Sequence, residues 1–328
     1  MKELEERQIR ASGVLCDVAV RNAVEAAAAK TIETFGKVHV VCNNAGVGAG
    51  GPIDQVRHAD WDWILAVNLM GVVYGMETFL PLIRSHGEGG TFVNTASMAG
   101  MISPPGMEPY SATKFAVVAM SEGWAGQLAP EGINVSVLCP GFVKTKINQS
   151  GRTRQAQFGG PVDSPVVADS MVENGIDPQR VGRRVLEAIQ AGERYIFTHP
   201  DMRPFVEARF AGLMSAFDAA AASPALAGWT TRPRPLGDGD ALVTVLITGG
   251  TKGIGLAIAR RLAPVHGRVV LAYHSDEAAA DVARAEILAL GAAVETVRCE
   301  VGTPEGRRPD GGDRAARPRR ATSSTRRR

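Results

Sequence analysis

Residues 243–263 read VTVLITGGTKGIGLAIARRLA, in which an apolar run, a glycine-rich turn and a helical pattern follow one another. Glycine tolerates the positive φ angles and the close backbone approach that such a turn requires. The unpaired N–H groups at the start of the following helix attract phosphate. A strand, a turn of this composition and a helix together predict the first unit of a dinucleotide-binding α/β fold. Such a unit normally opens a domain, yet here it begins at residue 243 of 328.

The rest of the chain alternates short apolar runs with helical patterns. Parallel strands need long crossover connections, so this alternation indicates βαβ units. We predict an α/β fold with a Rossmann-type doubly wound parallel sheet, in a truncated or permuted order of elements. Strands are expected at 13–18, 37–46, 90–97, 133–141, 194–200, 243–248, 268–273 and 292–301. The clearest helices are expected at 109–130, 201–220, 253–264 and 276–290.

Composition divides the chain into an α/β part at 1–220, a Pro- and Gly-rich linker at 221–241, a second α/β part at 242–301 and a tail at 302–328. The tail has nine Arg, three acidic residues and almost no apolar residues, so we expect it to be disordered. Without it the formal charge falls from +2 to −4, which argues against a nucleic-acid partner. Its composition resembles out-of-frame translation of GC-rich DNA; a solvated genuine tail and a nucleic-acid arm are the alternatives.

Several classes of protein are disfavoured by the sequence. No apolar run reaches the length of a membrane span, so we expect no membrane association. The charged start MKELEERQIRASG lacks the apolar core of a signal peptide, which favours a cytoplasmic protein. The four cysteines form no C-x-x-C pair and read as buried apolar residues. No clustered metal ligands are visible, so no metal site is predicted.

Residues 110–114 read YSATK, which places Tyr110 and Lys114 four residues apart on one face of a predicted helix. A tyrosine hydroxyl titrates at about pH 10, and we expect the lysine ammonium to favour the phenolate and lower that pKa. Ser97 ends a predicted strand, and such strand ends line the ligand crevice of parallel sheets. Its hydroxyl can stabilise charge on a substrate carbonyl oxygen. Alone, a Tyr–Lys pair at this spacing is more typical of a helix surface than of an active site.

Other segments of the chain carry motifs that support a catalytic role for this pair. NNAG at 43–46 resembles the turn after the fourth strand of the short-chain dehydrogenase/reductase family, and PGFVKT at 140–145 resembles the family segment that holds the nicotinamide. The resemblance covers most of the chain. Four residues match the catalytic tetrad of the family in order and spacing: Asn68, Ser97, Tyr110 and Lys114.

The resemblance implies a role for each member of the tetrad. Tyr110 would be the general acid/base, and Ser97 would orient and stabilise the substrate oxygen. Lys114 would lower the pKa of the tyrosine and bind the nicotinamide ribose, and Asn68 would hold a water in a proton relay with it. Hydride would pass between nicotinamide C4 and a carbonyl carbon. Asp17 would contact adenine, or is a plain strand-end residue. The cofactor-binding residues implied in this part are Asp17, Val18, Asn44, Ala45, Gly46, Tyr110, Lys114, Pro140, Gly141, Val143 and Thr145.

The opening glycine motif of the family is missing from residues 1–220 and stands complete at 248–255. In one interpretation, 242–301 fill the places of the missing strands one and two, as in a permuted reductase. In the other, a truncated member is joined to the start of a second member and has no turnover, serving at most as an interaction protein. Segments 13–18 and 292–301 correspond to the same strand and would compete for one place. The cofactor-binding residues implied here are Gly249, Lys252, Gly253, Ile254 and Gly255.

The resemblance also bears on cofactor and substrate. Lys252 precedes the second motif glycine, and His274 and Ser275 replace the acid that would bind a ribose 2′-OH, so NADP(H) is favoured over NAD(H). This segment resembles a 3-oxoacyl-carrier-protein reductase. The expected substrate is a moderately hydrophobic ketone or secondary alcohol, and a homo-oligomer is expected. An apolar pocket, or ordinary loop packing, is expected of Met98, Ile102, Met107 and Phe142.

Overall fold

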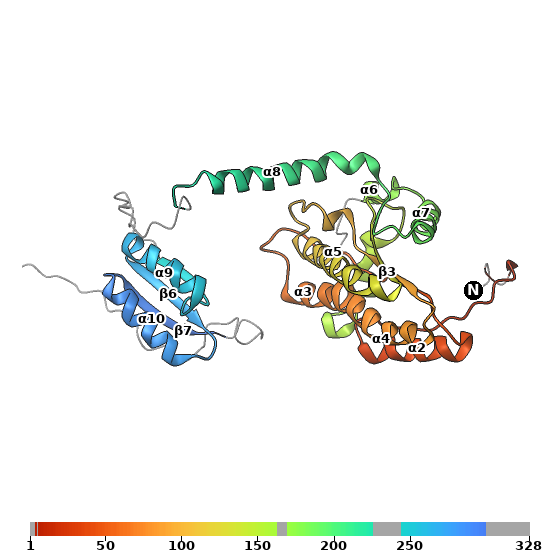
Figure 1. Ribbon diagram of the computed structural model, residues 1–328, viewed down its shortest axis with the longest axis horizontal. Coiled ribbons are helices and arrows are strands. Elements are labelled where there is room, and N and C mark those ends of the chain that lie inside the picture. Colours follow the sequence, from red (N-terminus) through yellow and green to blue (C-terminus); the bar gives the residue numbers. More distant parts are fainter. Residues whose placement is uncertain (1–3, 5, 163–168, 226–243, 300–328) are drawn as a thin grey trace, which may run out of the picture. The chain divides into compact units, whose positions relative to one another are not determined.

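The computed structural model describes residues 4, 6–162, 169–225 and 244–299 (Figure 1). They belong to two compact units, an N-terminal unit within Met1–Gly228 and a C-terminal unit within Trp229–Arg328. Most of the predicted linker at 221–241 and all of the predicted tail at 302–328 lie outside the described residues.

The N-terminal unit is built on a four-stranded parallel sheet in the order β1-β2-β3-β4. Its strands are β1 (Val40–Asn43), β2 (Gly90–Thr95), β3 (Ile133–Cys139) and β4 (Tyr195–Phe197). The central strands β2 and β3 are apolar and buried on both faces, as a sheet covered by two helical layers requires. The sequence predicted all four strands.

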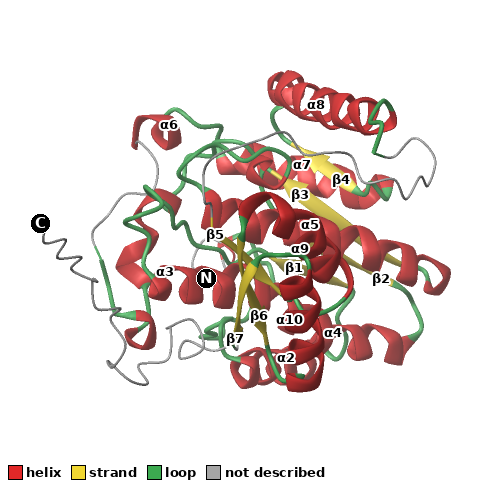
Figure 2. Cartoon of the chain, turned by 90° about the vertical axis from the view of Figure 1, so that its left-hand side faces the viewer, coloured by secondary structure: helices red, strands yellow, loops and turns green. Residues whose placement is uncertain are grey.

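Helices cover both faces of this sheet. On one face, α4 (Gly71–His86) and α5 (Glu108–Leu128) share a core with β1, β2 and β3. On the other face, α7 (Pro178–Ala191) packs against β2, β3 and β4. Figure 2 shows α2 (Arg21–Phe35) beside α4, and the two helices are in contact. The predicted doubly wound α/β fold is confirmed. The remaining helices of this unit are α3 (His58–Ile64), α6 (Asp169–Glu173) and α8 (Arg203–Ala221).

The strand predicted at 13–18 is wrong: this segment has no regular secondary structure. In the family order the segment would occupy the strand position farthest from β1, beyond two intervening strands. Among the described residues of the N-terminal unit, β1 is itself the edge of the sheet, so 13–18 has no neighbouring strand to pair with. A single strand without a partner leaves its backbone groups unpaired and is not stable.

A cavity of about 310 Å³ lies beside the unpaired edge of this sheet. It is lined by Val24 and Ala27 of α2, by Val40 of β1 and by Phe79 of α4. An exposed apolar strand edge is a template for further strand pairing.

The helical stretch His58–His86 is interrupted by a π-helical turn, η1 (Leu65–Met70). By length and composition alone this stretch could cross a membrane, which the sequence inspection had not recognised. In this structure it packs inside the unit, where Ile64 and Ile83 are fully buried. It therefore serves as a core helix here.

The C-terminal unit contains the parallel strands β5 (Thr244–Thr248), β6 (Arg268–Tyr273) and β7 (Ala293–Arg298), in that order. Helices α9 (Gly253–His266) and α10 (Glu277–Ala289) bury their apolar residues in one cluster with these strands. Figure 2 shows the two helices side by side. The predicted strands and helices of this segment are confirmed. The opposite side is bare, and Leu246 of β5 is 64% exposed.

Candidate active site

The residues that follow β1, β2 and β3 meet at one edge of the N-terminal sheet, because parallel strands all end there. A cavity of about 800 Å³ opens between these strand ends. The predicted catalytic and cofactor residues that line it are Asn44, Ala45, Gly46, Ser97, Tyr110, Lys114, Pro140, Gly141, Val143 and Thr145. The fold thus gathers segments that lie up to a hundred positions apart in the sequence.

Lys114 is buried beneath these strand ends. Its Nζ donates a hydrogen bond of 2.8 Å to the carbonyl oxygen of Thr95, the last residue of β2. Burial lowers the pKa of Lys114 to about 8. The ammonium lies 5.5 Å from the ring centroid of Tyr110, one helical turn earlier. A proton can therefore leave or join this amine near neutral pH.

Tyr110 and Ser97 lie together in the same cavity. Burial raises the pKa of Tyr110 above its usual value, and the hydroxyl of Ser97 acts in the opposite direction. The sequence predicted a lowered pKa for Tyr110, and this is wrong in direction; an effect of Lys114 on the tyrosine remains a prediction. Burial makes the charged phenolate costly, and this cost outweighs the hydrogen bond from Ser97.

Asn68 is fully buried inside the π-helical turn η1, a kind of turn that is frequent at functional sites. Its Oδ1 accepts a hydrogen bond of 2.8 Å from the N–H of Val47, and its Nδ2 donates one of 2.9 Å to the carbonyl of Val47. Asn68 therefore fixes the chain after β1. A Cβ added to Gly46 would lie 3.4 Å from Asn68 Oδ1 and 3.6 Å from Lys114 Nζ, so these three residues converge. The proposed water relay remains a prediction.

A second, apolar cavity of about 120 Å³ adjoins the first. Its lining includes Met98, Ile102, Met107 and Phe142, which confirms the predicted apolar pocket. Among the described residues that line it, none carries a formal charge. Ser97 and Tyr110 line both cavities, so the predicted reacting groups stand where the two meet.

Asp17 and Val18, two predicted cofactor contacts, do not line the large cavity. Both oxygens of Asp17 accept hydrogen bonds from Nε2 of Gln155, at 2.9 and 3.0 Å. Gln155 in turn accepts a hydrogen bond of 2.9 Å from Trp63 Nε1. The segment 13–18 is thereby fastened to the loop after β3. An adenine contact of Asp17 remains a prediction.

His199 holds the backbone that separates the two cavities. Its Nδ1 accepts a hydrogen bond of 3.1 Å from the N–H of Gly141, and its Nε2 lies 3.1 Å from the carbonyl oxygen of Phe142. With Nδ1 as acceptor, Nε2 carries the proton and donates to that carbonyl. A Cβ on Gly141 would come within 2.7 Å of the His199 ring, so the imidazole also requires glycine there.

The glycine turn at 248–255 lies in the C-terminal unit and has the conformation that the sequence predicts. Gly249 and Gly253 have φ angles of 64° and 50°, which favour glycine. A Cβ on Gly255 would come within 2.3 Å of the carbonyl oxygen of Gly249, so the helix can begin this close to the turn only with glycine. Ile254 is exposed beside them. Lys252 forms an ion pair with Asp276, the residue before α10.

Sequence inspection did not single out His199 and Gln155. The partners of His199 lie 58 and 57 positions away, and Asp17 lies 138 positions from Gln155. A local sequence pattern cannot indicate contacts between residues this far apart in the chain.

The comparisons with known proteins agree with this geometry. The family model described as short chain dehydrogenase matches residues 1–156 and 243–308. A protein named CLA biosynthesis dehydrogenase/reductase, from Lactiplantibacillus plantarum, is 33% identical over 208 residues, which cover 60% of this chain and 73% of that protein. A C alpha-dehydrogenase of a Sphingobium species is 33% identical over 218 residues, covering 65% of this chain and 72% of that protein.

Solved structures show the same fold. A short-chain dehydrogenase/reductase from Burkholderia phymatum, in complex with NAD, is similar with a TM-score of 0.61 and 35% identity. The similarity covers 72% of this chain and 83% of that chain. The chain belongs to the short-chain dehydrogenase family and is an oxidoreductase of the class that acts on CH–OH groups.

Proposed function

We propose that this protein interconverts a ketone and a secondary alcohol with a nicotinamide cofactor, and that Tyr110 is its general acid/base. The observation that carries the proposal is the position of Ser97 and Tyr110, which line both the large cavity and the apolar cavity. A substrate in the apolar cavity would present its oxygen to these hydroxyls, while the large cavity would hold the cofactor.

The residues of the large cavity fit a nicotinamide cofactor. Lys114 offers a buried ammonium within the cavity, and Thr145 also lines it. Glycine at position 46 leaves the wall beside Lys114 flat, as close approach of a ring and a ribose requires. When bound, the cofactor accepts or supplies the hydride.

The protein's part of the reaction is proton transfer and charge stabilisation. In the reducing direction Tyr110 gives its hydroxyl proton to the substrate oxygen as hydride reaches the carbonyl carbon. Ser97 donates a hydrogen bond to the same oxygen. A cationic Lys114 stabilises the phenolate that Tyr110 becomes. Asn68, fixed against Val47, keeps the wall of the cavity in place and is proposed to hold the relay water.

The phosphate-binding turn of the family is at 248–255 in this chain, in the C-terminal unit. We propose that this turn binds the pyrophosphate of a nicotinamide dinucleotide. Two observations support this: one family model matches both segments, and the glycine conformations of the turn are those a phosphate cradle needs. The residues proposed to contact the pyrophosphate are Gly249, Lys252, Gly253, Ile254 and Gly255. In the N-terminal unit, Asp17 and Val18 are proposed to contact adenine.

The cofactor proposed is NADP(H) in preference to NAD(H). Lys252 is the basic residue that would meet a 2′-phosphate, which requires it to leave Asp276. The NAD bound in the Burkholderia phymatum structure supports a dinucleotide in general. The substrate proposed has a small uncharged apolar group beside its carbonyl, because the described lining of the apolar cavity is uncharged and includes Met98, Met107 and Met202.

Cofactor titration of the full chain, followed by nucleotide fluorescence, tests the proposal. NADPH should bind more tightly than NADH. Gly255→Val should weaken binding at least tenfold, because its side chain displaces the Gly249 carbonyl. Gly126→Ala is the matched control, since a Cβ there meets nothing within 4 Å.

If neither nucleotide binds at millimolar concentration, the proposed enzyme function is wrong, and the alternative of an inactive fused protein is favoured. If the Gly255→Val variant binds nucleotide as tightly as the parent protein, the turn at 248–255 does not bind the nucleotide. We also propose that the protein forms a homo-oligomer. Sedimentation with and without cofactor tests this and shows whether the oligomer depends on the cofactor.

A further inference from the structure

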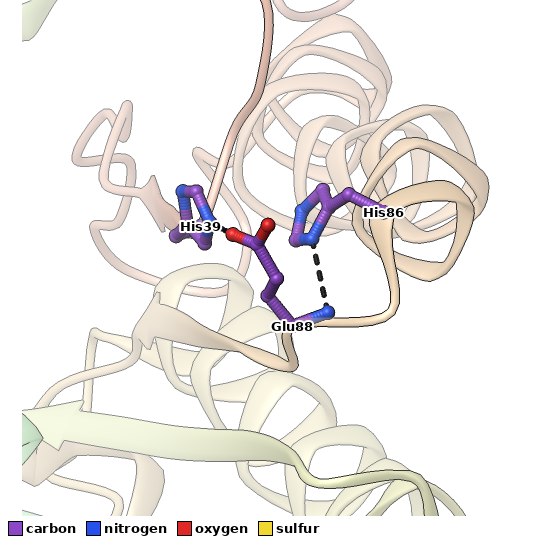
Figure 3. A group of neighbouring side chains, drawn as sticks. All are labelled: His39, His86 and Glu88. Carbon is purple, nitrogen blue, oxygen red and sulfur yellow. Dashed lines mark hydrogen bonds and ion pairs between the residues drawn. The ribbon is translucent and has the colours of Figure 1, made fainter.

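Three side chains with metal-ligating atoms meet at the end of the N-terminal sheet opposite the cavities (Figure 3). His39 directly precedes β1, His86 is the last residue of α4, and Glu88 lies in the turn from α4 to β2. One ligand atom from each lies within 4.8 Å of the other two. The sequence showed no clustered ligands, because His39 is far from the other two along the chain.

The ring of His86 is held as a ligand would be. Its Nε2 lies 2.9 Å from the carbonyl oxygen of Val38, so this nitrogen carries the proton and donates. The lone pair is therefore on Nδ1, where it accepts a hydrogen bond of 3.2 Å from the N–H of Glu88 that a metal ion would have to replace. Histidines that bind metals generally donate their second ring nitrogen to a carbonyl in this way.

His39 and Glu88 complete the group. His39 Nε2 lies 2.8 Å from Glu88 Oε2, and the two histidine rings lie 4.5 Å apart between centroids. The other carboxylate oxygen of Glu88 pairs with the ammonium of Lys37. Lys37 therefore occupies the place that a cation would take. About half of each side chain of His39 and Glu88 is accessible to solvent, so an ion can enter.

The backbone under the group is fixed before any ion binds. The carbonyl of His39 accepts a hydrogen bond of 2.7 Å from Thr91, which joins the starts of β1 and β2. Gly87 and Gly89 have φ angles of 69° and 72°, and so hold Glu88 in a tight turn that other residues would strain. Binding needs no rearrangement of these strands, but the hydrogen bonds that His86 Nδ1 and His39 Nε2 now make must be exchanged for bonds to the ion.

We propose that His39, His86 and Glu88 form a binding site for a divalent transition-metal ion of the zinc type. Two imidazole nitrogens and one carboxylate oxygen are a donor set that suits Zn²⁺, and solvent would supply the fourth ligand. Ligand atoms of a tetrahedral zinc site lie about 2.1 Å from the metal, so the side chains must draw together and Lys37 must release Glu88. Mg²⁺ and Ca²⁺ prefer oxygen ligands and would not compete. The ion would tie the start of β1 to the turn before β2, remote from the reacting groups.

Equilibrium titration of the full chain with Zn²⁺ tests the proposal. One ion should bind per chain, and His86→Ala or His39→Ala should each weaken that binding at least tenfold. Lys37→Met should tighten it several-fold, because the carboxylate no longer has a competing cation. His58→Ala is the matched control: this exposed histidine lies outside the group and should leave the affinity unchanged.

Bound Co²⁺ should show the intense visible absorption of a tetrahedral nitrogen–oxygen site, and His86→Ala should abolish it. Circular dichroism of each variant separates loss of a ligand from loss of the fold. The proposal is overturned if Zn²⁺ binds no better than Mg²⁺, if folded His39→Ala and His86→Ala proteins keep the parent affinity, or if Lys37→Met weakens binding.

Discussion

The Nζ atom of Lys114 donates its hydrogen bond to the main-chain carbonyl oxygen of Thr95, at 2.8 Å. This contact joins α5 to the end of β2 and holds a buried amine at the wall of the large cavity. The proposed function requires this amine, but its burial lowers the free energy of unfolding because a buried ammonium is costly. Both consequences can be measured.

Lys114→Met should stabilise the protein at neutral pH while abolishing activity. Burial lowers the pKa of Lys114 from its usual 10.5 to about 8, so the folded state resists protonation that the unfolded chain accepts. The penalty is complete below pH 8 and disappears as the pH rises toward 10.5, because the unfolded state binds more protons in that window. Removing the amine should raise the free energy of unfolding by about 1–3 kcal/mol at pH 7.

Thermal unfolding of parent and variant at several pH values checks this. The difference between them should be largest below pH 8 and should shrink above it. An equal or less stable variant at neutral pH would contradict the assignment of a buried, costly ammonium.

Tyr110→Phe should leave cofactor binding unchanged and reduce turnover by about 10²–10⁴-fold, the usual contribution of a general acid/base. The substitution removes only the hydroxyl, and the ring keeps its place below Lys114. Steady-state assay with a small apolar ketone, beside a nucleotide titration, separates the two effects. Tyr74→Phe on α4 serves as control and should keep full activity. Substantial turnover by the Tyr110→Phe enzyme would remove Tyr110 from the proposed chemistry.

His199→Ala should raise KM for the substrate more than it lowers kcat. The imidazole fixes the Gly141 N–H and the Phe142 carbonyl, and Phe142 lines the apolar cavity. Losing two such hydrogen bonds should cost about 1–3 kcal/mol of stability. His199→Asn should recover part of the affinity, because its shorter amide can still accept from Gly141. If KM is unchanged in a stably folded alanine variant, His199 does not position the pocket.

Asp60→Asn should destabilise the N-terminal unit by about 2 kcal/mol or more, because a charge is left without its counter-ion. Asp60 pairs with the guanidinium of Arg154, whose side chain is only 1% exposed. That guanidinium also lies 5.2 Å from the ring centroid of Trp63. Urea unfolding at neutral pH measures the loss. Glu25→Gln, which removes an exposed ion pair with Arg21, should change stability little.

The same pair predicts a pH dependence. Partial burial alone would raise the pKa of Asp60, but hydrogen bonds from Arg57 and Arg154 lower it from its usual 3.8 to about 2. The stabilisation is therefore present above pH 3.8 and is lost as the pH falls toward 2. The parent protein should lose stability across this range more steeply than Asp60→Asn. Parallel curves for the two proteins would contradict the lowered pKa.

The sequence predicted most of the regular elements, since their signals are local. Gly249 and Gly253 adopt the positive φ angles that the turn requires, and this requirement involves only the few residues of the turn. Tyr110 and Lys114 share a helix face because of helical geometry alone. The tetrad and the apolar pocket were predicted from the resemblance to the family. Only for Ser97, at the end of a strand, did the topology of a parallel sheet by itself indicate a place at the ligand crevice.

The segment 13–18 shows where this reasoning fails. Its composition is that of a strand, but a strand exists only beside another strand. Its state therefore depends on which strands surround it, and the described N-terminal sheet ends at β1. The predicted lowering of the Tyr110 pKa is wrong for a similar reason. Burial raises this pKa, and the spacing of residues along a helix does not indicate how deeply a side chain is buried.

Sequence alone determined the layered α/β architecture and the turn at 248–255, because each rests on periodicity or on steric limits of single residues. The reacting groups were named from the resemblance to the family, and their roles remain a proposal. Only the tertiary structure decided that His199 clamps the loop at 141–142, that Gln155 holds Asp17, and that His39, His86 and Glu88 meet. These contacts join positions far apart in the chain, and packing in three dimensions brings them within bonding distance.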